Sequence, residues 1–187
     1  MVQAKRDKTV KAEWGLLALA QNGDKAACRK LFDSYQGRLY SLAYLITGIA
    51  AEAEDIVQET FVRALHAKIT HHRGTPQGFL GTIAYRLAVK EKRRREKIAE
   101  INSEEIFDNT VDTFEKMLLD ERDRLIATTI RSLDDKHRDV LVLRFYADHS
   151  YEEIAELLQV SPGTVKSRIF YAVKSCRKIL REKGLTS

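Results

Sequence analysis

The spacing of apolar residues constrains the fold of this chain more than any other feature. Apolar residues recur three and four positions apart through most of the 187 residues, and strict alternation is rare. Only two prolines and nine glycines occur, so few positions break a helix. A period near 3.6 is typical of amphipathic helices, whereas half-buried strands alternate with a period of two. The sequence therefore predicts an all-α protein.

A reversal of charge along the chain predicts two domains. Residues 86–97 contain seven bases and two acids, whereas residues 98–120 contain one base and seven acids. We interpret the start of the acidic segment as a solvated linker, because a chain of this length accommodates two small domains. The predicted parts are an N-terminal extension, a first helical domain, the linker and a second helical domain: 1–24, 25–97, 98–112 and 113–187.

Local start and stop signals predict where the helices lie. Two glycines and a proline within residues 70–78 indicate a loop. Trp14 and the leucines that follow it indicate the start of an apolar helix in the extension. The other predicted helices span about 24–47, 51–65, 79–97, 113–132, 135–146, 151–158 and 162–182.

Residues 150–172, SYEEIAELLQVSPGTVKSRIFYA, are typical of a helix-turn-helix. Ser150 followed by Glu153 predicts a capping box. Ser161 predicts a second cap, with Pro162 at the first helical position, where its missing N–H costs nothing. Gln159 falls in the turn, at a position where a positive φ would be costly for a residue other than glycine. In such a motif the second helix enters the major groove of DNA.

The second helix of this motif carries the charge that DNA binding requires. Residues 161–183 contain seven bases and one acid. Phosphate contacts supply affinity, and base contacts near the start of the helix supply specificity. The pattern therefore predicts DNA binding through the outward residues Ser161, Thr164, Lys166, Ser167, Arg168, Tyr171 and Lys174.

With these motifs in view, the chain resembles the sigma-70 family, in particular the extracytoplasmic-function (ECF, group 4) RNA polymerase sigma factors. Residues 133–180 resemble sigma region 4, which reads the minus-thirty-five promoter element. AEAEDIVQETFVRAL (residues 51–65) resembles the part of region 2 that docks on the polymerase. FLGTIAYRLAVKEKRRR (residues 79–95) resembles the part that opens and reads the minus-ten element. The resemblance implies a sigma factor that directs promoter-specific transcription initiation.

The resemblance also implies which residues act. Those expected to bind polymerase are Asp55, Gln58, Glu59 and Arg63. Those expected to contact minus-ten DNA are Phe79, Tyr85, Arg86, Lys90, Arg93 and Arg94. Many family members have tryptophan, asparagine and aspartate at the positions of Phe79, Arg86 and Lys90, so the preferred minus-ten sequence cannot be copied from relatives.

The expected partners are core RNA polymerase, through its beta-prime clamp helices and beta flap, promoter DNA and an anti-sigma factor. We expect no enzymatic activity, cofactor or metal site. No apolar run approaches the length of a membrane span, and no signal peptide is evident, so we expect a cytoplasmic protein. Cys28 and Cys176 are far apart and lie in no CxxC motif, which predicts two reduced thiols.

Two other readings remain open from sequence. A stand-alone helix-turn-helix regulator would explain residues 150–181 and would bind its duplex tightly without polymerase. A nucleic-acid enzyme could use Asp55 and Glu59, four residues apart on one helix, as metal ligands, but no further carboxylate cluster supports it. His66, His71 and His72 also invite a metal site, yet no cysteine or carboxylate lies at ligand spacing beside them.

Overall fold

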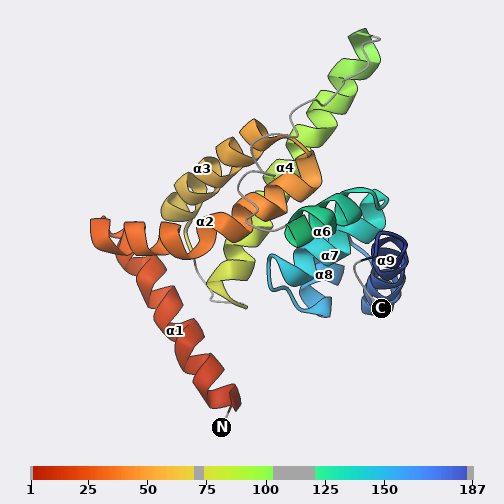
Figure 1. The fold of residues 1–187 in the computed structure, drawn as a ribbon. Coiled ribbons are helices and arrows are strands. Elements are labelled where there is room, and N and C mark those ends of the chain that lie inside the picture. Colours follow the sequence, from red (N-terminus) through yellow and green to blue (C-terminus); the bar gives the residue numbers. More distant parts are fainter. Residues whose placement is uncertain (1, 70–73, 103–120, 185–187) are drawn as a thin grey trace.

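The computed structural model describes residues 2–69, 74–102 and 121–184 (Figure 1). Within those ranges the secondary structure is helical and contains no strand, which confirms the all-α prediction. The helices are α1 (Val2–Gln21), α2 (Lys25–Thr47), α3 (Ala50–His66), α4 (Pro76–Asn102), α6 (Glu121–Arg131), α7 (Asp135–Phe145), α8 (Tyr151–Leu158) and α9 (Pro162–Glu182). We call α1–α4 the N-terminal bundle and α6–α9 the C-terminal bundle.

Caps set the ends of α2 where the sequence predicts them. The Asp24 carboxylate accepts a hydrogen bond from the Ala27 N–H at 2.9 Å, which satisfies a free donor at the helix start. At the other end, Gly48 has a φ of 80°, and its N–H donates to the Tyr44 carbonyl. Glycine adopts this left-handed conformation without the steric cost that a Cβ would add.

The start of α4 corrects the predicted loop. The helix begins at Pro76, so Pro76, Gln77 and Gly78 are helical rather than part of a loop that ends at residue 78. The Thr75 hydroxyl accepts a hydrogen bond from the Gly78 N–H at 3.0 Å and caps the helix. A proline at the first helical position has no hydrogen bond to lose, so here it starts a helix instead of breaking one.

The far end of α4 also differs from expectation. The helix continues to Asn102, five residues into the predicted 98–112 linker. The rest of that linker, and residues 113–120 of the helix expected at 113–132, lie outside the described residues.

Helix α1 packs on the N-terminal bundle through its second half. Trp14, Leu17 and Ala20 are buried in the bundle core. The Gln21 amide donates to the carbonyls of Ala64 and Ala67, at 2.7 and 3.0 Å, where α3 ends. The segment predicted as an extension therefore completes the bundle from residue 14 onward.

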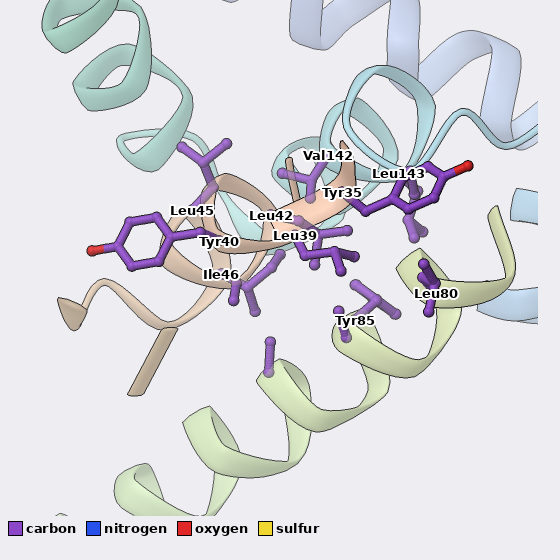
Figure 2. Close-up of a cluster of buried hydrophobic side chains, with 14 of the residues drawn as sticks. Tyr35, Leu39, Tyr40, Leu42, Leu45, Ile46, Leu80, Tyr85, Val142 and Leu143 are labelled. Atoms are coloured by element: carbon purple, nitrogen blue, oxygen red, sulfur yellow. The ribbon is translucent and has the colours of Figure 1, made fainter. Parts of the chain in front are cut away.

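The two bundles share one hydrophobic core. Leu39 and Leu42 of α2 and Leu80 of α4 are fully buried, and Val142 and Leu143 of α7 are buried in the same cluster (Figure 2). Because α7 belongs to the C-terminal bundle, apolar burial continues across the boundary between the bundles.

Each helix of the C-terminal bundle from α7 onward starts at a side-chain cap. Asp134 accepts from the His137 N–H, Ser150 and Glu153 form the predicted capping box, and Ser161 accepts from the Thr164 N–H. Between α8 and α9, Gln159 has a φ of 55°, so the turn adopts the left-handed conformation that is costly for a residue other than glycine. These caps position α9 relative to α8.

Candidate functional site

The polar face of α3 is open to solvent. Asp55, Gln58 and Arg63 are exposed and Glu59 is half-buried, while Ile56 on the opposite face is buried. The Glu59 carboxylate accepts a hydrogen bond from Arg63 Nε at 2.6 Å, one helical turn away. All four residues expected to bind polymerase therefore lie together on one accessible face.

An apolar surface adjoins this polar face. Val62, one turn after Gln58, is 51% exposed, and Phe32 of α2 is 37% exposed. The Phe32 ring lies 5.0 Å from the Phe61 ring, beside a hollow of about 450 Å³. Sequence reasoning missed Phe32 and Val62, although an apolar residue on the polar stripe of an amphipathic helix is a readable signal.

The exposed side of α4 carries a basic stripe. Phe79 is half-buried at its beginning, and its ring lies 5.9 Å from that of Trp14. The residues of the stripe recur three or four positions apart, so they share one side of the helix. The exposed bases of the 86–97 run are Arg86, Lys90, Arg93, Arg94 and Lys97, and Arg94 also pairs with Glu91.

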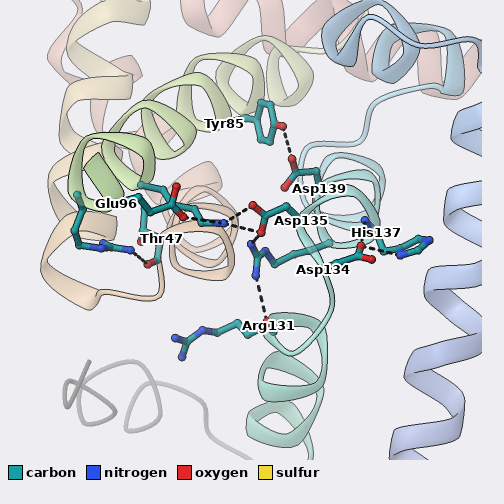
Figure 3. A network of polar contacts seen from close by, with 11 residues as sticks. Thr47, Tyr85, Glu96, Arg131, Asp134, Asp135, His137 and Asp139 are labelled. Atoms are coloured by element: carbon teal, nitrogen blue, oxygen red, sulfur yellow. Dashed lines mark hydrogen bonds and ion pairs between the residues drawn. The ribbon is translucent and has the colours of Figure 1, made fainter. Parts of the chain in front are cut away.

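Two other bases of the same run point inward. Lys92 Nζ donates to both carboxylate oxygens of Asp135 on α7, at 2.6 and 2.5 Å (Figure 3). Arg95 pairs with Glu52 at 2.5 Å and donates to the Thr47 carbonyl at 2.7 Å. The basic run is thus divided between an outward stripe and inward structural pairs.

Tyr85 differs from the other five residues expected to contact minus-ten DNA. Its ring is buried, and its hydroxyl donates to Asp139 Oδ2 of α7 at 2.7 Å (Figure 3). Burial, and then the neighbouring Asp139 carboxylate, raises the pKa of Tyr85. Burial likewise raises the pKa of Asp139, against the hydrogen bond from Tyr85. In this arrangement Tyr85 is not accessible to DNA.

The start of α9 presents the surface that the helix-turn-helix pattern predicts. Val165 and Ile169 are buried and fix the inner face of the helix. The Ser161 hydroxyl caps the first turn at 3.0 Å from the Thr164 nitrogen. Among the residues expected to contact minus-thirty-five DNA, Thr164 and Arg168 are half-buried, and the exposed ones are Ser161, Lys166, Ser167, Tyr171 and Lys174.

A basic groove of about 800 Å³ runs beside α9 and extends this surface. Tyr151 at the start of α8 and Phe170 line it, together with bases such as Lys174 and Arg177. Phe170 is 63% exposed, and its ring meets that of Tyr171 edge to face at 5.4 Å. Phe170 was not among the predicted residues, and aromatic rings among bases are typical of surfaces that contact nucleic acid.

The described residues show no metal site in this region. They contain no group of three or more His, Cys, Asp or Glu side chains placed to hold a metal ion. His66 Nδ1 lies 2.8 Å from the Val62 carbonyl, whereas His71 and His72 lie outside the described residues.

No helix in the described ranges is long and apolar enough to cross a membrane. Cys28 and Cys176 are free thiols.

Comparison with known proteins identifies the family. Residues 31–98 match Sigma-70 region 2, and residues 129–178 match Sigma-70, region 4. The chain is 33% identical over 170 residues to the ECF RNA polymerase sigma factor SigL of Mycobacterium tuberculosis, covering 89% of this chain and 96% of that protein. The chain belongs to the ECF sigma factors of the sigma-70 family. As such it binds core RNA polymerase and directs promoter-specific transcription initiation, a regulatory rather than a catalytic role.

Other relatives agree with this assignment. The ECF sigma factor SigW of Bacillus subtilis is 30% identical to it, with 87% of this chain and 93% of that protein covered. In fold, this ECF sigma factor is similar to the sigma factor RpoE from Bartonella quintana, solved in complex with the anti-sigma factor NepR. That similarity has a TM-score of 0.65 at 21% identity and covers 82% of this chain and 96% of the other.

Proposed function

We propose that this sigma factor docks on core RNA polymerase through α3. The polar face of Asp55, Gln58, Glu59 and Arg63 would select the beta-prime clamp helices, and the adjoining apolar surface would supply most of the affinity. Charged groups chiefly set specificity and association rate, whereas buried apolar anchors carry binding energy. The C-terminal bundle would contact the beta flap.

Helix α4 would read and open the minus-ten element. The outward stripe of Arg86, Lys90, Arg93 and Arg94 provides cations at helical spacing for successive phosphates. Phe79 stands at the beginning of that stripe, where an aromatic ring can stack on an unpaired base. Melting requires unstacking bases, and capture of an extruded base offsets that cost. For Tyr85 to contribute, α7 would first have to move away.

Helix α9 would read the minus-thirty-five element from the major groove. Lys166, Ser167 and Tyr171 are exposed on its first turns, where recognition helices reach base edges. The bases lining the groove beside α9 would hold the phosphates. We propose a corresponding division of labour. Residues 25–102, to the end of α4, would serve polymerase docking and minus-ten recognition, the remainder of segment 98–112 would be linker, and residues 113–187 would serve minus-thirty-five recognition.

Control of this sigma factor would come from a protein partner. Two similar solved structures are complexes, RpoE with the anti-sigma factor NepR and CnrH with the cytosolic domain of CnrY. We propose that an anti-sigma factor likewise binds this chain, in the cytoplasm. The protein would act without enzymatic activity, cofactor or metal.

The open polar face of α3, with its apolar border, carries the docking proposal. Purified protein should co-elute with bacterial core RNA polymerase in gel filtration. The variant Asp55→Ala/Gln58→Ala/Glu59→Ala should weaken that complex by roughly ten-fold or more, the scale of losing a few central interface contacts. Promoters would then be selected with the holoenzyme from a random DNA library.

Glu96→Ala/Glu100→Ala on the exposed side of α4 is the matched control, because it removes two carboxylates away from both α3 and the C-terminal bundle. It should bind core as the wild type does. If neither wild type nor control forms a complex, and the free protein instead binds duplex DNA tightly, the protein acts as a stand-alone regulator. If the wild type, the triple variant and the control all bind core equally well, the docking face lies elsewhere than on α3.

A further inference from the structure

A small apolar cavity lies within the C-terminal bundle, between α6, α7 and α9. Its volume is about 340 Å³, at the lower end of the range for small-molecule sites. Each of the three helices contributes apolar side chains to its wall, namely Ile126, Ile130, Leu141, Phe145, Val173 and Leu180. A cavity of this size and composition accepts a small molecule with a largely apolar body.

One buried polar group in the wall of this cavity is unpaired. Thr129 is 1% exposed, and its hydroxyl has no hydrogen-bond partner among the described residues. By contrast, the hydroxyl of the neighbouring Thr128 donates to the Arg124 carbonyl at 2.9 Å. Buried hydroxyl groups are nearly always paired, because an unpaired one loses its hydration without compensation. The Thr129 hydroxyl is therefore available to a ligand that enters the cavity.

The charged group at this cavity is a cation. Arg177 is exposed and lines the cavity, and none of the described side chains in the wall is a carboxylate. Burial, and then the Asp123 carboxylate outside the wall, raises the pKa of Tyr146, so that phenol stays uncharged. Burial also raises the pKa of the Cys176 thiol, as expected beside apolar side chains. The lining therefore favours a ligand with an anionic end group.

We infer that this cavity binds a small apolar carboxylic acid, whose carboxylate pairs with Arg177 and accepts a hydrogen bond from Thr129. The apolar body of the acid would fill the space between the three helices, where its burial supplies most of the affinity. A small molecule fits this site better than a helix of a partner protein, because only a group that enters the cavity can meet the buried hydroxyl.

The site would also connect a ligand to DNA binding. Arg177 lines the basic groove beside α9 as well as the cavity, so the bound acid would compete with a DNA phosphate for one guanidinium. This consequence rests on the proposed role of α9, whereas the site itself does not. For holoenzyme on a selected promoter, the acid should reduce the slope of log affinity against log salt by about 0.9. An unchanged slope overturns this consequence.

The two cysteines provide a test of the site in the native sequence, with decanoate as the probe. Cys176 lines the cavity, whereas Cys28 lines the hollow of about 450 Å³ beside Phe32. That hollow is also largely apolar, but a cation and a carboxylate line it, Arg29 and Asp33, and no unpaired buried hydroxyl of the described residues does. Decanoate that merely partitions onto apolar surface would therefore protect both thiols. The rate at which N-ethylmaleimide alkylates each thiol, followed by peptide mass spectrometry, distinguishes the two cases.

In the free wild-type chain, decanoate at about ten times its Kd should slow alkylation of Cys176 by roughly ten-fold, because only the unliganded fraction reacts. The rate at Cys28 should not change. Acetate at the same concentration has the carboxylate without the apolar body, and it should protect neither thiol.

The two polar groups can be removed separately. Thr129→Val and Arg177→Gln should each raise the Kd for decanoate by roughly ten-fold, the scale of one hydrogen bond to a charged group. Thr128→Val and Lys178→Gln are the matched controls, because neither residue lines the cavity, and they should keep the wild-type Kd. Without ligand, Thr129→Val should unfold at no lower temperature than the wild type, since it removes an unpaired buried hydroxyl.

Equal protection of both thiols, or a wild-type Kd in both Thr129→Val and Arg177→Gln, overturns the inference. Protection of Cys176 that grows with protein concentration in the absence of decanoate would assign the cavity to a second copy of the chain. Protection by core polymerase but not by decanoate would assign it to the beta flap instead, and either result also overturns the ligand. The measurements on the free chain need no polymerase, so their failure is distinguishable from a failure of the docking proposal.

Discussion

Local caps start helices in both bundles, but the N-terminal bundle adds long-range contacts that place α1 and α4. In the C-terminal bundle, Asp134, Ser150 and Ser161 fix helix starts by bonds that reach three residues along the chain. In the N-terminal bundle, the positions of α1 and α4 depend on distant partners, such as Gln21 with the end of α3 and Arg95 with Thr47. Local bonds leave a readable sequence pattern, whereas distant contacts do not.

The same contrast separates two sides of α4. Arg86, Lys90 and Arg93 point to solvent, and Arg94 pairs only with Glu91 within α4, while Lys92 and Arg95 are held by carboxylates of other helices. Bases that look equivalent in sequence therefore differ in availability to DNA. Substitutions that remove buried or paired side chains test the long-range contacts, and substitutions that change the backbone conformation test the local ones.

The largest effect should come from Leu31→Ala in α2. Leu31 is 1% exposed, so truncation leaves a cavity and should lower the free energy of unfolding by about 2–5 kcal/mol. Trp14 is the single tryptophan of the chain and lies in the N-terminal bundle, so its fluorescence during denaturant unfolding reports that bundle. Leu19→Ala, at a residue 52% exposed, should change stability by no more than about 0.5 kcal/mol. Equal effects of the two substitutions would contradict burial as the source of stability.

The next effect should distinguish the outward and inward bases of α4. Arg93→Ala should reduce the slope of log affinity against log salt by about 0.9 for holoenzyme on a selected promoter, as expected for one lost phosphate contact. When the salt concentration rises from roughly 50 to 200 mM, Arg93→Ala should therefore lose about three- to four-fold less affinity than the wild type loses. Arg95→Ala should leave the slope unchanged, because Glu52 of the same bundle already pairs with Arg95. A matching change of slope in Arg95→Ala would place Arg95 on DNA and contradict the distinction.

A smaller effect should follow from relieving local strain in the helix-turn-helix. Gln159 holds a φ of 55°, where a Cβ is unfavourable, so Gln159→Gly should raise the free energy of unfolding by roughly 0.5–1 kcal/mol. Gln36→Gly, inside α2, should lower it by a similar amount, because glycine there only adds flexibility to the unfolded chain. Thermal unfolding followed by circular dichroism measures both. Destabilisation by both substitutions would show that the Gln159 side chain contributes more than its backbone costs.

The smallest effect should be a pH dependence at the boundary of the bundles. Burial lowers the pKa of His149 from its usual 6.5. At a pH between the folded and the unfolded pKa of His149, the unfolded chain binds more protons than the folded chain. The contribution of His149 to the free energy of unfolding is therefore fully present above pH 6.5, and it is lost as the pH falls through the folded pKa. The raised pKa of Asp139 acts in the opposite sense, because the folded chain then binds more protons as the pH falls.

The experiment compares denaturant midpoints at about pH 7.5 and pH 5.5, on either side of the ordinary histidine range. His149→Gln keeps a polar side chain but does not titrate, so it should show a smaller loss on acidification than the wild type. The difference between the two proteins isolates His149 from Asp139. An identical pH dependence would remove His149 as its source.

The sequence by itself determined the helices that depend on neighbouring residues. Predicted boundaries at 151–158 and 162–182 agree with α8 and α9, because Ser150 and Ser161 bond to backbone groups three residues ahead. Asp55, Gln58, Glu59 and Arg63 also share one face of α3, since helical spacing alone decides which side chains lie together.

Only the tertiary structure decided the rest. The start of α4 is an exception, because Thr75 and Pro76 form the same local cap-and-proline pattern as Ser161 and Pro162. In the sequence Tyr85 has the pattern of an accessible aromatic residue. In the structure it is buried, and Asp139, 54 residues later, accepts a hydrogen bond from its hydroxyl. No neighbouring residue in the sequence explains why position 81 is glycine. The explanation is the Ala147 side chain of the other bundle, which leaves no room for a Cβ at position 81. A contact between distant segments depends on how whole helices are placed, and no short stretch of sequence contains that information.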